Sequence, residues 1–71
     1  MYLYKTVKEK LFHVDIGFYT SFGIKVFCNG KEVGFVSDVS VDEAFVSEIV
    51  RQCNYMQLKP KYLQDVVEAL I

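Results

Sequence analysis

His13 and Asp15 lie close together in the chain and are the side chains that come nearest to an acid–base pair. The chain also has two cysteines, Cys28 and Cys53, and a histidine that deprotonated one of them would create a thiol nucleophile. The neighbours of the cysteines argue against this chemistry. Cys28 adjoins an expected hairpin turn, and Cys53 falls on an apolar helical stripe, where cysteine behaves as a small hydrophobic residue. We therefore predict no catalytic residues and no enzyme activity, unless the fold gathers His13, Asp15 and a cysteine in one pocket.

Metal, cofactor and phosphate sites lack the residues that they need. A structural zinc ion takes four cysteine or histidine ligands, whereas the chain has two cysteines and one histidine, without CxxC or HxxxH spacing. The four glycines are scattered and form no phosphate-binding loop. Asp65 and Glu68 share one helix face, but Lys61 lies one turn before Asp65 and indicates a solvated face. We predict no metal, no cofactor and no small-molecule ligand.

The elements that hold these residues must share one core, because 71 residues are too few for two. We therefore expect a single domain over residues 1–71. Hydrophobic residues make up 52% of the chain, which is more than so small an interior can bury, so apolar surface is left for a partner to cover. Two cysteines without an apolar signal segment predict a reduced, cytoplasmic protein. No apolar run approaches the ~20 residues that a membrane-spanning helix needs, so we expect no membrane contact.

The charge of the chain is nearly balanced but unevenly distributed. The net charge is −1, with five lysines against two acids in residues 1–31 and seven acids against three basic residues in 32–71. This split can be an ordinary solvated surface, or it can steer head-to-tail or partner docking. The basic N-terminal segment, with Tyr2, Tyr4 and Tyr19, makes weak binding of single-stranded nucleic acid the alternative function. The low net charge makes nucleic acid the weaker candidate partner.

Asn29 and Gly30 form the most specific local signal, because this pair between alternating apolar runs predicts a two-residue type I′ hairpin. The turn predicts the pairs Val26 with Val33 and Ile24 with Phe35 on the buried face. Gly23 and Gly34 then relieve crowding or admit a bulge. The predicted buried face of the first hairpin strand consists of Phe18, Phe22, Ile24 and Val26.

The segment Tyr2 to Val14 is predicted to supply a third strand at an edge of the sheet, where its lysines discourage pairing with other chains. Whether it pairs beside the first or the second strand of the hairpin stays open. Beyond the hairpin, Ser40 and Glu43 match a capping box and predict the start of a helix. The apolar stripe expected on this helix consists of Phe45, Val46, Ile49, Val50, Cys53 and Met56.

Residues 54–59 are predicted to connect this helix to a second one, in which Pro60 suits the first turn. The expected buried face of the second helix consists of Leu63, Val66, Val67 and Leu70. The apolar end, residues 69–71, is expected to pack into the core or against a partner. The fold class that follows is α+β: a three-stranded antiparallel sheet followed by two α-helices packed on one face.

Several short motifs in residues 18–70 carry a resemblance to known proteins. They are Phe22-Gly23-Ile24, Asp38-Val39-Ser40, Cys53-Asn54, Leu58-Lys59-Pro60 and Leu63-Gln64-Asp65-Val66-Val67-Glu68. In these motifs the chain resembles a family of short proteins from clostridial and related Gram-positive bacteria that is described as a domain of unknown function. Lys59 departs from the pattern, since such sequences often have a small capping residue before the proline. The resemblance implies no activity.

The function that we expect is that of a small interaction or regulatory module, which self-associates as a homodimer or binds another protein. The contact would be made by a helix face or by the second face of the sheet. The candidate interface residues are Phe27, Val36, Tyr55 and Tyr62, which have no clear place in the predicted core. Alternatively, each of them completes that core.

Overall fold

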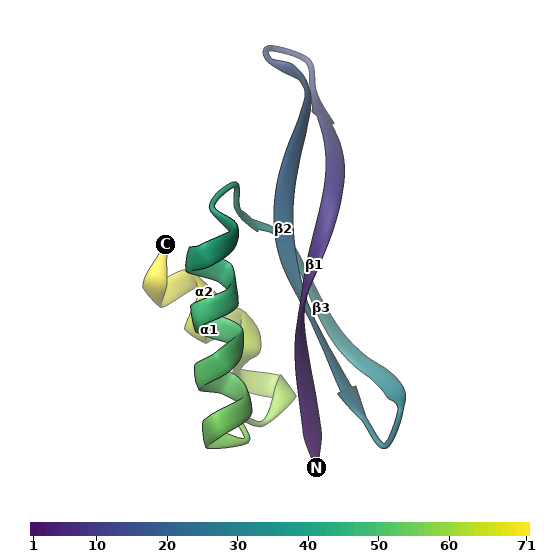
Figure 1. The fold of residues 1–71 in the computed structure, drawn as a ribbon, viewed down its shortest axis with the longest axis vertical. Coiled ribbons are helices and arrows are strands. Elements are labelled where there is room, and N and C mark those ends of the chain that lie inside the picture. Colours follow the sequence, from purple (N-terminus) through teal and green to yellow (C-terminus); the bar gives the residue numbers. More distant parts are fainter.

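Three strands are followed by two helices in the computed structural model, which describes residues 1–71 (Figure 1). The elements are β1 (Tyr2–His13), β2 (Gly17–Cys28), β3 (Lys31–Ser40), α1 (Glu43–Met56), the 3-10 turn η1 (Pro60–Tyr62) and α2 (Leu63–Leu70). Both helices lie on the same side of the sheet. The predicted α+β fold, a three-stranded antiparallel sheet with two helices packed on one face, is confirmed.

The N-terminal segment forms an edge strand, as predicted, and its neighbour is the first strand of the hairpin. The strand order is β1-β2-β3, and both pairs are antiparallel. β1 and β2 pair without interruption from Tyr2↔Cys28 to His13↔Gly17. Because β3 ends at Ser40, opposite Phe22, β1 and β2 continue beyond it as a two-stranded arm, residues 10–20. The arm projects past the helices at the top of Figure 1.

The turn between β2 and β3 has the predicted geometry. Asn29 and Gly30 have φ angles of 53° and 82°, and a type I′ turn requires positive φ at both central residues. The flanking residues Cys28 and Lys31 pair directly across the turn. The Asn-Gly signal therefore placed the hairpin correctly.

The predicted register fails at Val33, because β3 carries an extra residue there. The prediction paired Val26 with Val33, whereas Val26 pairs with Gly34 in the structure. Such a β-bulge leaves one residue unpaired and turns the side chains that follow it to the opposite face. Gly34 suits the position, because a Cβ added to it would lie 2.9 Å from Cγ1 of Val26.

The bulge exchanges the faces of Phe35 and Val36. The prediction paired Ile24 with Phe35, whereas the structure pairs Ile24 with Val36 and Lys25 with Phe35. Val36 is half-buried and packs against the core, which agrees with the alternative that it completes the core. Phe35 is 44% exposed on the face away from the helices.

A second irregularity lies where β3 passes Gly23, and residues 37–39 bulge out of the pairing. Asp38 in this bulge has a φ of 54°, in the left-handed region. A Cβ added to Gly23 would lie 2.6 Å from the carbonyl oxygen of Val36 and 3.2 Å from Cε1 of Phe35. Gly23 is therefore required by the close approach of β3, which agrees with the prediction that it relieves crowding or admits a bulge.

α1 begins at Glu43 with Asp42 as its N-cap, so the predicted cap at Ser40 is wrong. The Asp42 carboxylate accepts a hydrogen bond from the backbone N–H of Phe45 at 3.3 Å. Ser40 instead ends β3, where it pairs with Phe22, and its hydroxyl accepts a hydrogen bond from the N–H of Asp42. Strand pairing keeps Ser40 extended, and Asp42, two residues later, becomes the cap.

α1 also ends later than predicted, which shortens the connector expected over residues 54–59. The helix runs to Met56 and ends at Gln57, whose φ of 50° is left-handed and whose N–H bonds to the carbonyl groups of Asn54 and Cys53. Pro60 then occupies the first turn of η1, which continues directly into α2. The prediction that Pro60 begins the second helical segment is confirmed.

The core lies between the sheet and the two helices. Its buried apolar residues are Tyr4, Phe22, Ile24, Val26, Val39, Val46, Ile49, Val50, Cys53, Leu63 and Val67. Phe18, predicted on the buried face, is 72% exposed because it lies on the arm beyond the helices. Met56 and Leu70 are exposed at the margins of their helices, and Ile71 does not pack into the core.

Two side-chain amides at the C-terminal end of α1 and its cap close the outer edge of β1. Asn54 accepts a hydrogen bond from Tyr4 N–H at 2.7 Å and donates one to the Tyr4 carbonyl at 3.0 Å. Gln57 does the same for Tyr2, at 2.8 Å and 3.0 Å. These four bonds occupy backbone groups that would otherwise be free to pair with another strand.

Candidate interaction surface on the open sheet face

One face of the sheet carries no helix, and we call it the open face. Tyr4 and Thr6 contact the helical layer, through Leu58 and Ser47 respectively, so the odd-numbered side chains of β1 point away from it. The β1–β2 and β2–β3 pairing then assigns the neighbouring strands. The open face consists of Leu3, Lys5, Val7, Glu9 and Leu11 of β1, Tyr19, Lys25 and Phe27 of β2, and Glu32 and Phe35 of β3.

The half of the open face near the N-terminus is apolar and carries a net positive charge, because Glu32 forms an ion pair with Lys25 at 3.3 Å and leaves Lys5 unpaired. Leu3 is 49% exposed, and Phe27 lies directly across from it on β2. The Lys5 Nζ lies 5.6 Å from the centroid of the Phe27 ring. The Lys25 Nζ lies 5.4 Å from the ring of Phe35. Aromatic rings beneath lysine ammonium groups form a surface that can bind apolar and anionic groups together.

The other half of the open face is acidic and hydrogen-bonded. The Glu9 carboxylate accepts hydrogen bonds from the Ser37 hydroxyl at 2.7 Å and from the Asp38 N–H at 2.8 Å. The Asp38 carboxylate accepts hydrogen bonds from the hydroxyl groups of Tyr19 and Ser21. The hydrogen bond to Asp38 raises the pKa of Tyr19 above its usual value, because it favours the protonated phenol. The network holds Asp38 in its left-handed conformation.

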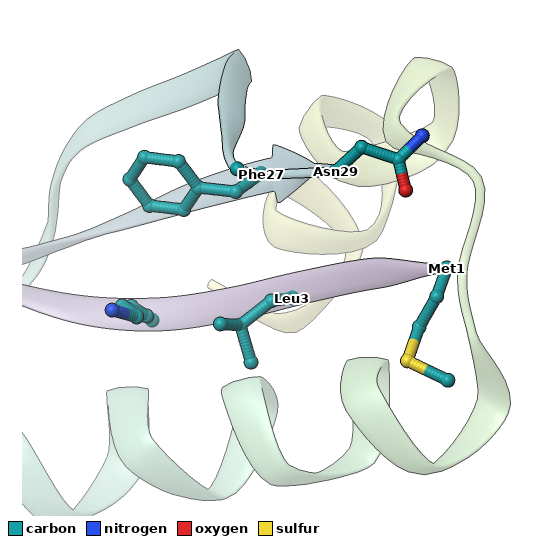
Figure 2. A pocket seen from close by; sticks show the side chains of 6 residues that line it. Met1, Leu3, Phe27 and Asn29 are labelled. Carbon is teal, nitrogen blue, oxygen red and sulfur yellow. The ribbon is translucent and has the colours of Figure 1, made fainter.

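A pocket of about 390 Å³ lies at the N-terminal end of the open face. Its lining residues are Met1, Leu3, Lys5, Phe27, Asn29 and Gly30. Figure 2 shows Met1 just before β1, Leu3 on β1 and Phe27 on β2 at this end of the sheet. The pocket brings apolar side chains and the Lys5 ammonium group together, but no histidine, cysteine or carboxylate lines it.

The four predicted interface residues lie on different parts of the molecule. Phe27 is half-buried on the open face, and Val36 packs against the core on the opposite face. Tyr55 is 86% exposed on α1, where it lines a separate pocket of about 330 Å³. Tyr62 is exposed on η1, with the Lys61 Nζ 5.1 Å from its ring. Of the four, only Phe27 belongs to the open face.

Sequence reasoning missed Leu3 and Phe35 as members of this surface. Leu3 could have been found, since it alternates with Tyr2 and Tyr4 and must face away from whichever side buries them. Phe35 could not, because its face depends on the extra residue at Val33. A run of apolar residues at 33, 35 and 36 is compatible with either register.

The arm carries a second group of exposed apolar side chains at its tip. Phe12 and Phe18 pair across the strands with ring centroids 5.1 Å apart, in an edge-to-face arrangement. Val14 and Ile16 in the connecting turn are exposed as well. Lys10 extends over the Phe18 ring, at 5.9 Å from its centroid. These residues lie on the part of the arm that projects past the helices (Figure 1).

The structure does not assemble the thiol site considered from the sequence. His13 Nδ1 and Asp15 Oδ2 lie 3.9 Å apart at the tip of the arm. Cys28 pairs with Tyr2 at the other end of the strands, on the order of 35 Å away at ~3.3 Å per residue. Cys53 is buried in the core, and burial raises the pKa of its thiol. No three His, Cys, Asp or Glu side chains come together in a possible metal site.

None of the helices has the length and apolar character needed to cross a membrane. Comparison of the chain with models of protein families, with curated proteins and with solved structures finds no match.

Proposed function

We propose that the protein is a small cytoplasmic interaction module that self-associates through the open face of its sheet. The observation that carries this proposal is the presence of Leu3, Phe27 and Phe35 together on a face that neither helix covers. Covering apolar surface contributes roughly 25 cal/mol per Å², and a domain this small has little other stabilisation to draw on. Aromatic side chains such as Phe27 and Phe35 are common anchors of protein interfaces.

The cytoplasmic setting is supported by the cysteines. Cys28 and Cys53 are both free thiols, and Cys53 is sealed in the core. Small domains that work in oxidising compartments usually gain stability from disulfides. A domain that holds its cysteines reduced and apart fits a reducing compartment better.

Light scattering coupled to size exclusion tests the proposal, with the protein run from low to high micromolar concentration. The average mass is expected to rise from that of a monomer towards that of a dimer. Phe35→Ser is expected to weaken association by at least about tenfold, equivalent to roughly 1.4 kcal/mol.

Tyr55→Ser is the matched control, because it removes an equally large aromatic ring from the exposed side of α1. This variant should associate like the wild type. A wild-type protein that stays monomeric at high micromolar concentration contradicts the proposal. If Phe35→Ser and Tyr55→Ser weaken self-association equally, the contact is not specific to the open face.

Single-stranded nucleic acid is the second candidate, and one feature favours it. Phe27 and Phe35 lie on an open sheet face beneath Lys5 and Lys25, and bases can stack on exposed rings while lysines contact phosphates. Glu9 on the same face and the net charge of −1 weigh against it. Binding of a single-stranded oligonucleotide that weakens as salt rises would support this candidate. No binding at low ionic strength would remove it.

We also propose that the chain is related to the clostridial proteins that its motifs resemble. Three motif residues have definite structural tasks, which would explain why relatives retain them. Gly23 admits the approach of β3, Asp38 accepts hydrogen bonds from two hydroxyl groups, and Asn54 closes the edge of β1. Relatives that fold the same way should keep these three residues. Frequent large side chains at the position of Gly23 would contradict the relationship.

A further inference from the structure

We infer that the partner of the open face is a second copy of this chain, which lies antiparallel across a two-fold axis close to Val7. This inference rests on the proposed function and adds the geometry of the contact. In a two-fold dimer the same surface is used twice, so that surface must be complementary to itself. The open face has this property.

The side chains along β1 are arranged symmetrically about Val7: apolar residues lie at equal distances on either side of it, and so do two charged residues of opposite sign. On the open side, the order is Leu3, Lys5, Val7, Glu9 and Leu11. A two-fold rotation at Val7 places Lys5 of each copy against Glu9 of the other. The same rotation places Leu3 against Leu11 and Val7 against its own copy. Charge and apolar character therefore match along the whole strand.

The neighbouring strands change this pattern only in the acidic half. Lys25 lies directly across from Lys5, but it forms an ion pair with Glu32 at 3.3 Å, so Lys5 supplies the unpaired positive charge of the basic half. Asp38 is hydrogen-bonded to Glu9, in the acidic half. An antiparallel second copy brings each basic half against an acidic half. A parallel copy would instead bring lysines against lysines, which disfavours that orientation.

Lys5 and Glu9 are free to pair between copies. Neither residue forms an ion pair within the chain. The ion pairs of the chain are His13–Asp15, Lys25–Glu32 and Glu48–Arg51. Glu9 is already oriented, because two hydrogen bonds hold its carboxylate. Phe35 lies near the proposed axis, since its ring reaches Gly23 and Gly23 pairs with Val7. A partly exposed aromatic ring at the centre of an interface is the usual position of an energetic anchor.

The edges of the sheet favour contact through the face. The Tyr2 and Tyr4 backbone groups at the edge of β1 are occupied by Gln57 and Asn54. β3 at the other edge is interrupted by two bulges, which disfavour a straight continuation of the ladder. Two sheets packed face to face, about 10 Å apart, need no free edge.

Charge reversal tests the inference, with light scattering as the readout and circular dichroism to check the fold. Lys5→Glu alone should weaken self-association by at least about tenfold, because it sets carboxylates against carboxylates in both contacts. Glu9→Lys alone should do the same with ammonium groups. An equimolar mixture of the two variants should form heterodimers of nearly wild-type strength, since both contacts are then restored. Only a contact that pairs position 5 with position 9 gives this rescue.

A cross-linking experiment covers the case in which Glu9→Lys disturbs the bulge at Asp38. In a Cys28→Ser background, Val7→Cys should be joined to its own copy by a short bifunctional maleimide. Leu3→Cys is the control, because in the proposed dimer the two copies of this residue are about 26 Å apart along the strands. Leu3→Cys mixed with Leu11→Cys should cross-link.

The outcomes separate this inference from the proposed function. A wild-type protein that never associates overturns both. A dimer that is sensitive to Phe35→Ser, but in which the charge-reversed variants show no rescue and Val7→Cys no cross-link, overturns the antiparallel arrangement alone. Rescue in the mixture together with the Val7→Cys cross-link establishes it.

Discussion

The side-chain amide of Asn54 pairs with the backbone of Tyr4 as a neighbouring strand would, with one hydrogen bond accepted and one donated. This contact joins residues far apart in the chain and ties α1 to the edge of the sheet. Loss of buried or half-buried hydrogen bonds leaves backbone groups unsatisfied, which is more costly than the bonds themselves.

Asn54→Ala should lower the free energy of unfolding by about 1–3 kcal/mol, because the Tyr4 N–H and carbonyl lose their partners. Urea denaturation followed by circular dichroism measures the change. Gln52→Ala, at an exposed position of α1, should change stability by less than about 0.5 kcal/mol. Equal effects at the two positions would mean that the amide pairing contributes nothing specific.

Gly23→Ala should destabilise the protein by about 1–3 kcal/mol, since the added methyl group would lie 2.6 Å from the backbone carbonyl of Val36. Gly17 is the control, because an added Cβ there meets nothing within 4 Å and the cost is limited to its φ of 78°. Gly17→Ala should therefore cost only about 1 kcal/mol. A Gly23→Ala variant as stable as the wild type would contradict the close approach of β3.

Phe18 and Phe22 test the boundary of the core. The sequence predicts both on one buried face, whereas the structure buries only Phe22. Phe22→Ala should cost about 3–5 kcal/mol, the usual cost of emptying a buried aromatic site. Phe18→Ala should cost less than about 1 kcal/mol, because its ring is largely exposed and packs edge-to-face against Phe12. Thermal and urea denaturation of both variants measure the two losses of stability. A larger loss for Phe18→Ala than for Phe22→Ala would mean that the arm belongs to the core.

Stability at alkaline pH should depend on Tyr4. Burial raises the pKa of Tyr4 from 10.0 to about 12, because the ionised phenolate is poorly solvated beside the core. Above pH 10 the unfolded chain releases this proton and the folded chain retains it, so stability falls as the pH rises from 10 to about 12. The loss should approach roughly 2–3 kcal/mol.

Tyr4→Phe removes the titrating group, and its stability should fall less steeply over the same pH range. The variant should also be weaker at neutral pH, because it lacks the hydrogen bond that the Tyr4 hydroxyl donates to the Leu58 carbonyl. Parallel stability curves for wild type and variant between pH 10 and 12 would show that Tyr4 is not the group responsible.

The general fold could be predicted because its signals are local. The Asn29-Gly30 turn, the helical apolar stripe and the position of Pro60 each depend on a few adjacent residues. These signals were sufficient for the strands, the helices and the side of the sheet that the helices cover. Predictions failed where a local preference competed with pairing, as at Ser40, which is a good helix cap but is held in β3 opposite Phe22.

The candidate site could be predicted only in part, because a bulge decides its composition. One extra residue at Val33 turns Phe35 to the open face and Val36 to the core, and no feature of the pattern distinguishes this register from the regular one. The four hydrogen bonds from side-chain amides to the edge of β1 could not be predicted from the sequence either, since they join Asn54 and Gln57 to residues 50 and 55 positions away. Phe27 was identified because its strand alternates regularly.

The most direct test of self-association through the open face is the change of backbone amide signals in NMR spectra as the wild-type protein is concentrated. If the open face is the contact, the signals of Leu3, Val7, Phe27 and Phe35 shift with concentration, while those of Gln52 and Tyr55 on α1 stay fixed. Shifts confined to α1 or to the tip of the arm, or no shifts up to high micromolar concentration, would contradict it.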